Sequence, residues 1–585
     1  MLRPDSGGSD TGIVKANTAM LAGLPVGCKP VVHYQTRIVY ACCRDFERTK
    51  LAVMQWKALC LALASLSLAA QPVPPAIDIR TLKADLTFLT SKPLAGRLSL
   101  QPGSEVAIEW IAAEYAKAGL KPAGGGSYIQ PVPLIEFFPD RTASALTVTA
   151  KGTAQEFKAP DASITFPQDF DLAGDVVFAG YGITAPELNY DDYRGLDVRG
   201  KIVLVFDHEP QENDPASIFN GTGNTRYATS RVKLLNAQAH GAIAVLQVAE
   251  PNRKHPSNQE RQARIPGSAV RSRRMPSQVI EGDEVQIPLV VVSDKVAADL
   301  IAAAGKKATE VQSAIDATLT PASMALPGVH VALCNRNRER RRGDSANLIG
   351  LVEGSDPQLK NEVVVISAHY DHDGAWPEGY FPGADDNGSG TVGVVALARA
   401  FANSPVKPKR SVLFAIFAAE ERGLLGSYYY AQHPLVPLAQ TRAVINFDLI
   451  GGNEAPSNQT QGLIEIEPDT TNLLNIVGLK YSPDYKSAVE RANGQVGLQL
   501  SYKWDEEAAL NVYFRSDQFP FALKGIPAMW WFTGFHPDYH QMTDTVDKIN
   551  FEKMAKILRL AYLTGWDFAD SDRPVRFIAN PAAPR

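Results

Sequence analysis

The chain has 585 residues, is 45% hydrophobic and 21% charged, and carries a formal net charge of −5 at pH 7. This length exceeds that of one ordinary domain, so we expect two or three domains. No uninterrupted apolar run reaches the roughly 18 residues of a membrane span. The slightly acidic charge balance does not indicate nucleic acid as a partner.

The first 70 residues differ from the rest of the chain. Residues 1–53 show no clear periodicity and hold three of the five cysteines. Residues 54–70, MQWKALCLALASLSLAA, combine a short basic start, an apolar core and a small-x-small sequence, as secretory signal peptides do. We therefore expect 1–53 to be a non-native upstream extension, 54–70 to be a signal peptide, and the mature protein to be exported, either periplasmic or secreted. The alternative is a genuine long N-terminus with a buried apolar helix.

Beyond residue 70 the pattern of elements changes twice. Residues 71–142 begin with apolar residues at helical spacing and predict two helices. Residues 143–325 contain short β-like runs such as ALTVTA and KIVLVF between polar loops, and predict a β-rich domain. Residues 326–585 return to strands alternating with helices. We expect 71–142 and 326–585 to form one domain into which 143–325 is inserted.

The last stretch holds two local features. An arginine-rich run, residues 336–342, is interpreted as the solvated tip of a β-hairpin. A helix is expected over Val546–Phe568, with Asp544 and Asp547 favouring the positive end of its dipole.

Residues 363–421 predict a parallel pair of strands. Val363–Ala368 and Ser411–Ala419 have the length and apolar composition of buried strands, and Ser389–Asn403 between them has the pattern of a helix. A strand, a crossover helix and a second strand in one sheet form a parallel pair. Because ligands in open α/β sheets bind at the carboxyl ends of strands, the residues that follow these strands are candidates for a site.

The residues at those strand ends have the chemistry of metal ligands. Zinc takes imidazole nitrogen and carboxylate oxygen, and a single catalytic zinc normally uses three protein ligands. Five candidates are available, which suits two metals roughly 3.5–4 Å apart with one bridging carboxylate. The candidates are His369, Asp385, Glu421, Asp448 and His540.

Two further acidic residues, Asp371 and Glu420, are not among the candidate ligands and are available for other roles. Asp371 stands two residues after His369, on the same side of an extended segment, and can orient that imidazole. Glu420 precedes a candidate ligand and is free to move protons. By contrast, we interpret Asp386 and Asn387 as caps of the helix that follows them. We interpret His372, His433 and His536 as solvated or locally satisfied, with His536 as the rival of His540.

These motifs resemble those of the di-zinc aminopeptidase family that includes bacterial leucyl aminopeptidase, yeast aminopeptidase Y and glutamate carboxypeptidase II. The stretch GYGITAPELNYDDYRGLDVRGKIVLV resembles the protease-associated (PA) domain that these enzymes often carry. The resemblance implies an α/β zinc-exopeptidase fold, with a mixed, mainly parallel central sheet flanked by helices, and an inserted β-rich PA domain.

The resemblance also assigns roles to single residues. The resemblance implies that the His of the H-x-D segment, here His369, is a ligand and that its Asp, here Asp371, orients it. The first Asp of G-A-D-D, here Asp385, bridges the metals. In the E-E pair the first Glu, Glu420, is the general base and the second, Glu421, is a ligand. The Asp ending the next strand, Asp448, and the His of Y-H-x-x-T-D-T, His540, complete the ligands.

The expected function is that of an exported metallo-exopeptidase that hydrolyses peptide bonds with two Zn²⁺ per chain, or another divalent metal. An aminopeptidase is favoured. A carboxypeptidase of the same fold is the first alternative and a receptor-like binding protein the second, although none of the expected ligands is lost. Serine-hydrolase and thermolysin-type activities are excluded, because neither G-x-S-x-G nor H-E-x-x-H is present.

Substrate contacts are weakly indicated. Arg515 is the candidate partner of a substrate carboxylate, whereas Asp517 is a candidate partner of an ammonium group. Related bacterial sequences often read S-D-H where this chain has Ser516, Asp517 and Gln518, which puts a contact at that place in doubt. The expected partners are peptide substrates, and the sequence leaves the oligomeric state open.

Overall fold

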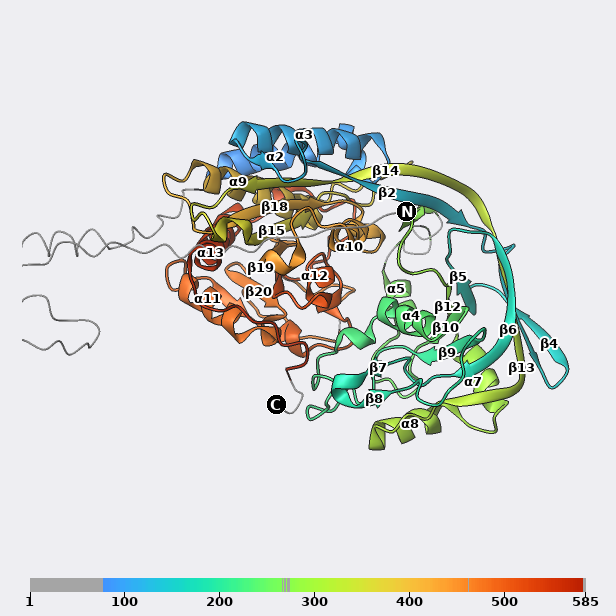
Figure 1. Cartoon of the computed structure of the whole chain (residues 1–585). Helices are drawn as coiled ribbons and strands as arrows, with labels where there is room; N and C mark the ends of the chain where they lie inside the picture. Colours follow the sequence, from blue (N-terminus) through green and yellow to red (C-terminus); the bar gives the residue numbers. More distant parts are fainter. Residues whose placement is uncertain (1–76, 266, 268–269, 271–273, 461, 582–585) are drawn as a thin grey trace, which may run out of the picture. The chain divides into compact units, whose positions relative to one another are not determined.

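The computed structural model describes residues 77–265, 267, 270, 274–460 and 462–581 (Figure 1). These residues belong to one compact unit, Pro72–Arg585, and most of their strands form two large sheets. The expected upstream extension and signal peptide, residues 1–70, lie outside the described residues. Among the helices that are described, none is long and apolar enough to cross a membrane.

The first sheet has ten strands in this part of the chain, and its centre is parallel. Strands β18, β15, β19 and β22 run parallel to one another, whereas β14 is antiparallel to β18 and β20 is antiparallel to β22. This confirms the expected mixed α/β architecture, with a parallel centre. In sheet order the strands are β11 (Ser277–Ile280), β2 (Ile129–Pro139), β14 (Asn337–Val352), β18 (Ser411–Phe417), β15 (Val363–His369), β19 (Thr441–Phe447), β22 (Ala528–Phe532), β20 (Leu473–Val477) and β21 (Gln499–Ser501), and β1 (Lys121–Pro122) pairs with β14.

Helices cover both faces of this sheet, because its central strands are apolar on both sides. Val364 and Ile366 of β15 face one core and Val363 and Val365 face the other. Each such side chain contributes about 1.5–3 kcal/mol when it is fully buried. The first face packs against α2 (Ile79–Leu89), α3 (Pro102–Ala118), α9 (Gly390–Asn403), α11 (Pro483–Asn493) and α13 (Phe551–Asp570), and the second against α10 (Leu425–Gln432) and α12 (Phe519–Leu523).

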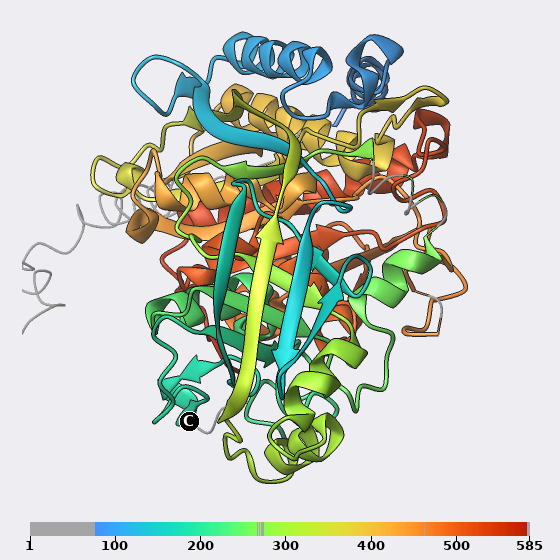
Figure 2. The same cartoon turned by 90° about the vertical axis from the view of Figure 1, so that its right-hand side faces the viewer.

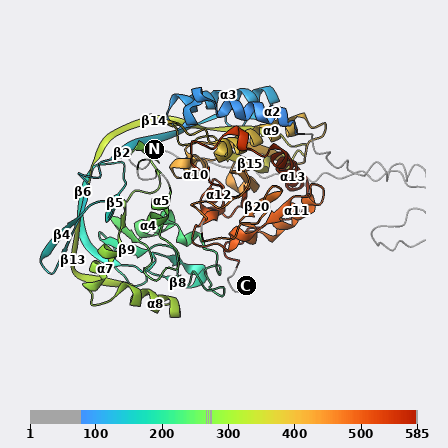
Figure 3. The same ribbon diagram turned by 180° about the vertical axis from the view of Figure 1, so that it is seen from behind.

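The crossover helix lies where the sequence predicts it. Helix α9 connects β15 to β18, and those two strands pair in parallel register from Val363 with Ser411 to His369 with Phe417. Figures 1 and 3 show α2 and α3 stacked over α9. The last helix differs from the prediction: α13 is preceded by a short 3₁₀ turn, η11 (Val546–Lys548), and its N-terminal cap is the side chain of Asn550.

The second sheet has eight strands in the described residues, and all of them except β13 come from the predicted β-rich stretch, residues 143–325. Its strands β6, β9, β10 and β12 are parallel. Helix α4 (Ser230–Ala239) covers one face, and α7 (Asp294–Ala302) and α8 (Ala308–Thr318) cover the other. The sheet order is β4 (Thr153–Phe157), β3 (Ala145–Ala150), β13 (Met324–Asn335), β6 (Phe170–Phe178), β9 (Ile202–Phe206), β10 (Ala244–Val248), β12 (Leu289–Val292) and β5 (Ala162–Ile164).

Strands β2 and β14 carry the chain between the two sheets. Only Arg336 separates β13 from β14, and Figure 2 shows β13 running toward the start of β14. The interpretation of residues 336–342 as a hairpin tip is therefore wrong: most of the run lies in β14 and pairs with β2, where Arg341 also makes an ion pair with Glu136. Strand β13 pairs with β3 and β6 up to its end, so we propose that the inserted part ends at Asn335 rather than at residue 325.

Short elements complete the described chain. They are β7 (Thr184–Ala185), β8 (Tyr190–Asp191), β16 (Ala375–Trp376), β17 (Gly379–Tyr380) and α5 (Asn258–Arg264).

Candidate metal centre

The three central parallel strands bring the expected side chains to one edge of the sheet. His369 is the last residue of β15, Asp448 directly follows β19, and Glu420 and Glu421 follow β18 after a two-residue link. All four belong to carboxyl ends of parallel strands that lie next to one another, so one topology assembles the group. His540 arrives from the loop after β22.

The first donor group consists of His369, Asp386 and Asp448. His369 Nε2 lies 3.4 Å from Asp448 Oδ1 and 3.6 Å from Asp386 Oδ1. All three residues are buried. Neither His369 Nε2 nor Asp448 Oδ1 makes a hydrogen bond to the described part of the chain. His369 Nε2 and Asp448 Oδ1 are therefore two buried polar atoms, 3.4 Å apart, that lack a hydrogen bond within the described residues. Such a pair fits two ligands of one cation.

The second donor group faces the other oxygen of Asp386. His540 Nε2 lies 3.2 Å from Asp386 Oδ2 and 3.5 Å from Glu421 Oε2. His540 Nδ1 lies 2.7 Å from Asp373 Oδ2, and His372 Nδ1 lies 2.7 Å from Glu421 Oε1. His372 is fully buried and therefore not solvated, and its contact with Glu421 fits the other expectation, that its ring is satisfied locally.

The structure corrects the choice between the two neighbouring aspartates. Asp385, the expected bridging ligand, points away from both donor groups: its Oδ1 accepts hydrogen bonds from Gly451 N–H at 2.7 Å and Ser389 Oγ at 3.1 Å, and its Oδ2 lies 3.2 Å from His536 Nε2. Asp386 occupies the shared position instead. Asp386 has an extended backbone (φ −104°, ψ 96°), in which successive side chains point to opposite sides.

The same turn separates the roles of Asp386 and Asn387. The side chain of Asn387 accepts a hydrogen bond from Gly390 N–H at 2.9 Å and donates to Phe447 O at 2.8 Å, so Asn387 caps α9 as expected. Asp386 takes no part in that cap. The backbone N–H groups of Asp385 and Asp386 donate to the carboxylate of Asp544, at 3.0 and 3.1 Å, and this fixes the turn. The sequence predicts that Asp544 lies at the N-terminus of the last helix; in the structure its carboxylate accepts these hydrogen bonds instead.

Asp371 supports both the histidine and the paired glutamates. His369 Nδ1 lies 3.2 Å from the backbone oxygen of Asp371 and 3.7 Å from its Oδ1. The Asp371 carboxylate accepts hydrogen bonds from Glu420 N–H at 3.0 Å and Glu421 N–H at 3.3 Å. Glu420 Oε2 lies 3.6 Å from His369 Nε2 and so reaches the first donor group. Asp371 therefore fixes the position of the Glu420–Glu421 turn relative to the histidine.

The site carries more negative charge than its own side chains can balance. Burial raises the pKa of Asp371 to about 6, and burial together with neighbouring carboxylates raises the pKa of Asp386 and of Glu420 well above the usual range. Burial alone would lower the pKa of His369, but Glu420 and Asp448 outweigh it and raise that pKa. Carboxylates that repel one another in a buried site are stabilised by divalent cations. The donor set therefore fits metal ions.

A buried arginine that the sequence analysis did not find holds two of the motif loops together. Arg97 donates to the backbone oxygens of Tyr370 at 2.7 Å, Pro382 at 2.8 Å and Gly383 at 3.0 Å. Burial lowers its pKa to about 10, although Asp371 among others favours the charged form. Arg97 lies in a short 3₁₀ segment between α2 and α3, far from the motifs in sequence, so no local pattern indicates its role.

The weaker candidates are placed as follows. His536 pairs with Asp385, so His540 and not His536 belongs to the donor groups. Asp517 is fully buried, its Oδ1 accepts from Ser427 Oγ, and burial raises its pKa to about 7. Arg515 is half-buried, with its guanidinium 5.3 Å from the ring centre of Phe535 and 3.4 Å from Tyr539 Oη.

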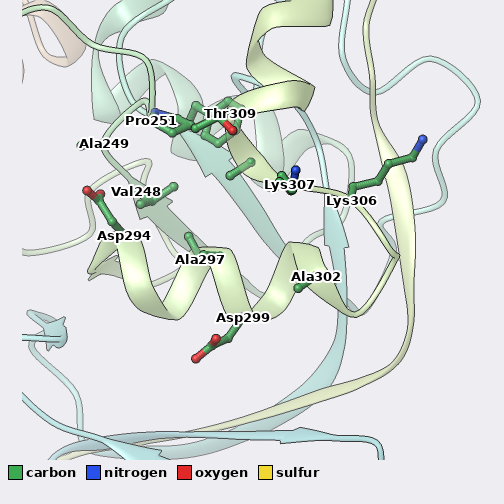
Figure 4. Close-up of a pocket in the computed structure, with 13 residues that line it drawn as sticks. Val248, Ala249, Pro251, Asp294, Ala297, Asp299, Ala302, Lys306, Lys307 and Thr309 are labelled. Carbon is green, nitrogen blue, oxygen red and sulfur yellow. The ribbon is translucent and has the colours of Figure 1, made fainter.

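A well-formed pocket of about 490 Å³ lies elsewhere, between α7 and the end of β10 (Figure 4). Its walls include Val248, Ala297 and Ala302, with Asp294 and Lys307 also lining it. No member of the donor groups lines this pocket, so it contributes nothing to the metal centre.

The geometry defines an α/β protein whose parallel strands carry a buried donor set for divalent cations at their carboxyl edge. Residues 347–564, which contain that whole donor set, match the model of peptidase family M28, and residues 172–300 match that of the PA domain. The chain thus contains an M28 peptidase domain interrupted by a PA domain, and the family resemblance derived from its motifs is confirmed.

Similar proteins include peptidases of bacteria and fungi. A probable lipoprotein aminopeptidase, LpqL, of Mycobacterium tuberculosis is 31% identical over 209 residues, which are 32% of this chain and 39% of the relative. A probable zinc metalloprotease of Pyrenophora tritici-repentis is 28% identical over 255 residues, or 40% and 55% of the two chains. The chain thus spans 39% and 55% of the lengths of these two relatives. Among solved structures, an aminopeptidase from Aneurinibacillus sp. strain AM-1 is 19% identical with a TM-score of 0.48, covering 86% of this chain and 96% of that one.

Proposed function

We propose that this protein is an exported di-zinc aminopeptidase that removes residues from the free amino termini of peptides. The observation that carries the proposal is the position of Asp386. Its two carboxylate oxygens face two different donor groups, at 3.6 Å from His369 Nε2 and 3.2 Å from His540 Nε2. A carboxylate shared in this way is the arrangement that a two-metal hydrolase needs.

In this proposal His369, Asp386 and Asp448 would hold one zinc ion, and Asp386, Glu421 and His540 would hold the other. His372 contacts Glu421 and Asp373 contacts His540, each at 2.7 Å, and these contacts would orient the two ligands. A pair of zinc ions, when bound, polarises the scissile carbonyl and lowers the pKa of water. The name of a relative, a zinc metalloprotease, supports zinc as the metal.

Glu420 is the proposed general base. Its carboxylate takes a proton from the attacking water and later delivers it to the leaving amine. The N–H of Glu420 donates to the Asp371 carboxylate, which holds the backbone of this residue in place. Burial and acidic neighbours raise its pKa above that of an exposed glutamate, and a less acidic carboxylate is a better proton acceptor.

The preference for amino termini rests on charge. The carboxylates at this edge outnumber the charges that two divalent ions offset, so an ammonium group is attracted and a substrate carboxylate is repelled. The name of the relative LpqL, a probable lipoprotein aminopeptidase, is in keeping with this. A cation at Arg515 would favour binding of the carboxyl end of the substrate. Its guanidinium group, however, already contacts Phe535 and Tyr539.

The deciding assay compares three versions of one peptide: free at both ends, acetylated at the amino end, and amidated at the carboxyl end. Acetylation should abolish cleavage and amidation should leave it intact. The opposite pattern would establish a carboxypeptidase, and binding without cleavage of any version would support the receptor-like alternative. Metal analysis of the same sample gives the number of zinc ions per chain.

Export is a separate part of the proposal, based on residues 54–70. Terminal sequencing of the protein from the medium or periplasm should find a mature N-terminus near Ala70 or Gln71. Residues 1–53 on the exported chain would contradict it.

A further inference from the structure

Four buried side chains of the PA domain gather away from the M28 centre. His208 and Glu212 lie in the loop after β9, and Glu250 and His255 lie in the loop after β10. One donor atom of each residue lies within 4.8 Å of the donor atoms of the other three. Strands β9 and β10 are parallel neighbours, so both loops leave the same edge of the second sheet.

The contacts within this His–Glu cluster are close. His255 Nε2 lies 2.9 Å from Glu212 Oε2 and 3.1 Å from Glu250 Oε1. His208 Nδ1 contacts Glu212 Oε1, and the two imidazole rings stack with centroids 4.8 Å apart. Four ligands around a tetrahedral zinc, with bonds of about 2.0–2.1 Å, are themselves separated by about 3.3 Å. The donor atoms of the cluster lie within 4.8 Å of one another, so side-chain movements can bring them to that separation.

Hydrogen bonds alone do not satisfy the cluster. Glu250 is 3% exposed, and its Oε1 makes no hydrogen bond to the described residues. His255 Nε2 lies 3.1 Å from this oxygen, but its hydrogen bond is to Glu212 Oε2 at 2.9 Å, and a single N–H cannot donate well to both carboxylates. A buried carboxylate oxygen aimed into a group of ligands, without a hydrogen bond, is an independent indication of a bound cation.

We propose that His208, Glu212, Glu250 and His255 bind one structural divalent metal ion, with zinc as the ion that this donor set prefers. Four protein ligands leave no open position for water or substrate, so the site is closed and serves stability rather than catalysis. The proposal does not depend on the chemistry proposed for the M28 centre, because the two sites share no residue.

The alternative is a pair of ion pairs without metal. Burial opposes protonation of the two histidines, but Glu212 and its acidic neighbours raise the pKa of His208 to about 9 and that of His255 to about 10. Two imidazolium groups would then balance two carboxylates. A divalent ion would replace both protons and leave the same net charge, so the two states differ in metal content and not in charge.

The surroundings give the metal an entry path and a purpose. Glu212 and His255 line a pocket of about 310 Å³, together with Lys503 and Glu507 of the M28 part. Asn224 of the PA domain donates to Ala508 O of the M28 part at 3.1 Å and to Glu212 Oε1 at 3.4 Å. The amide of Asn511 lies 3.5 Å from His208 Nε2. A metal here would tie the two PA loops together and hold them against residues 507–511.

The test is the metal content of the purified full-length protein, measured by mass spectrometry after dialysis against buffer free of chelator. Wild type should carry about three zinc ions per chain, two in the M28 centre and one in the PA domain. His255→Ala and the nearly isosteric Glu250→Gln should each remove about one. The matched control is His330→Ala, because His330 is an exposed PA-domain histidine paired with Asp175, and it should lose none.

A second measurement covers variants that fail to fold. Asp386→Asn removes the shared ligand of the M28 centre and leaves the PA cluster intact, so this protein should keep about one zinc ion per chain. If Asp386→Asn is metal-free, or if His255→Ala and Glu250→Gln contain as much metal as the control, the cluster is a pair of ion pairs and the proposal is overturned. An M28 centre that fails to bind metal in wild type would instead lower the total while leaving the loss caused by Glu250→Gln unchanged.

Discussion

The two His–carboxylate clusters of this protein arise from the same topology but differ in composition. Each gathers behind the carboxyl ends of neighbouring parallel strands, β15, β18 and β19 in one case and β9 and β10 in the other. In the M28 centre carboxylates outnumber histidines, and one of them, Asp386, faces two donor groups. In the PA domain two histidines meet two glutamates. In the functions proposed above, the surplus of carboxylates leaves Glu420 free for proton transfer, whereas all four side chains of the matched set bind the metal.

Both clusters are supported by a buried cation that donates to backbone carbonyls. Arg97 holds the Tyr370 and Pro382 carbonyls beside the M28 centre. Lys233 donates to Tyr181 O and, at 2.6 Å, to His208 O beside the PA cluster. Burial lowers the pKa of Lys233 to about 8, and Asp207 and Asp192 favour its charged form. In each case a loop that carries a histidine is fixed through its backbone, and the histidine side chain remains available for a ligand.

The largest expected effect comes from the adjacent pair Asp385 and Asp386. Asp386→Asn should lose the M28 metals and with them nearly all activity, because the ligand shared by both donor groups is replaced by an amide. Asp385→Asn should retain the metals, because its oxygen can still accept from Gly451 N–H. Metal content and kcat of the two variants, purified in parallel, make the comparison. Equal metal loss in both would show that the assignment of the shared ligand to Asp386 is wrong.

Glu420→Gln should follow, with kcat lowered by roughly 10²–10⁴ and the metal content unchanged. Glutamine has nearly the same shape but cannot accept the proton from water. Its backbone N–H can still donate to Asp371, so the neighbouring ligand Glu421 stays in place. Loss of metal from this variant would mean that the roles of Glu420 and Glu421 are exchanged.

The two buried cations should separate catalysis from stability. Arg97→Lys loses the planar fork and leaves at least one buried carbonyl without its donor, at a cost of about 1–3 kcal/mol for each. We expect lower stability together with an about tenfold lower kcat, because misplacement of the motif loops affects positioned groups. Lys233→Met should lower the free energy of unfolding by a similar amount and leave kcat unchanged. Denaturant unfolding and steady-state kinetics on both proteins test this, and a kcat loss in Lys233→Met would argue for coupling between the domains.

Local sequence patterns predict the fold well where periodicity and strand order decide it. The strands around His369 and Glu420 and the crossover helix α9 follow from apolar runs and spacing. The course of residues 336–342 does not follow, because β14 continues as a strand only by pairing with β2, which is about 200 residues away in sequence. An arginine-rich segment without its partner strand has the composition of a solvated loop.

The site shows the same limit at the scale of one residue. Motif spacing brings His369, Glu421, Asp448 and His540 together correctly, because each lies at or after the end of a neighbouring strand. The choice between Asp385 and Asp386 depends on the backbone angles of the turn. These angles are fixed by hydrogen bonds to Asp544, which is 159 residues from Asp385 in sequence. His208 and His255 were not singled out, because their glutamate partners come from two loops about 40 residues apart. No short motif joins them.

The smallest expected effect concerns Arg515 and decides which end of the substrate is bound. If the enzyme acts on amino termini, Arg515 does not hold a substrate carboxylate, and Arg515→Met removes only its contacts with Phe535 and Tyr539. We expect the loss of these partly exposed contacts to change kcat/KM by no more than about twofold, which corresponds to about 0.4 kcal/mol of transition-state stabilisation. That change should be the same for a peptide with a free carboxyl end and for its amide. A large loss confined to the free carboxylate would assign Arg515 to substrate binding and favour the carboxypeptidase. If kcat/KM changes equally for both peptides, Arg515 does not recognise the carboxyl end. The preference for a positively charged substrate terminus then comes from the surplus of carboxylates at the site.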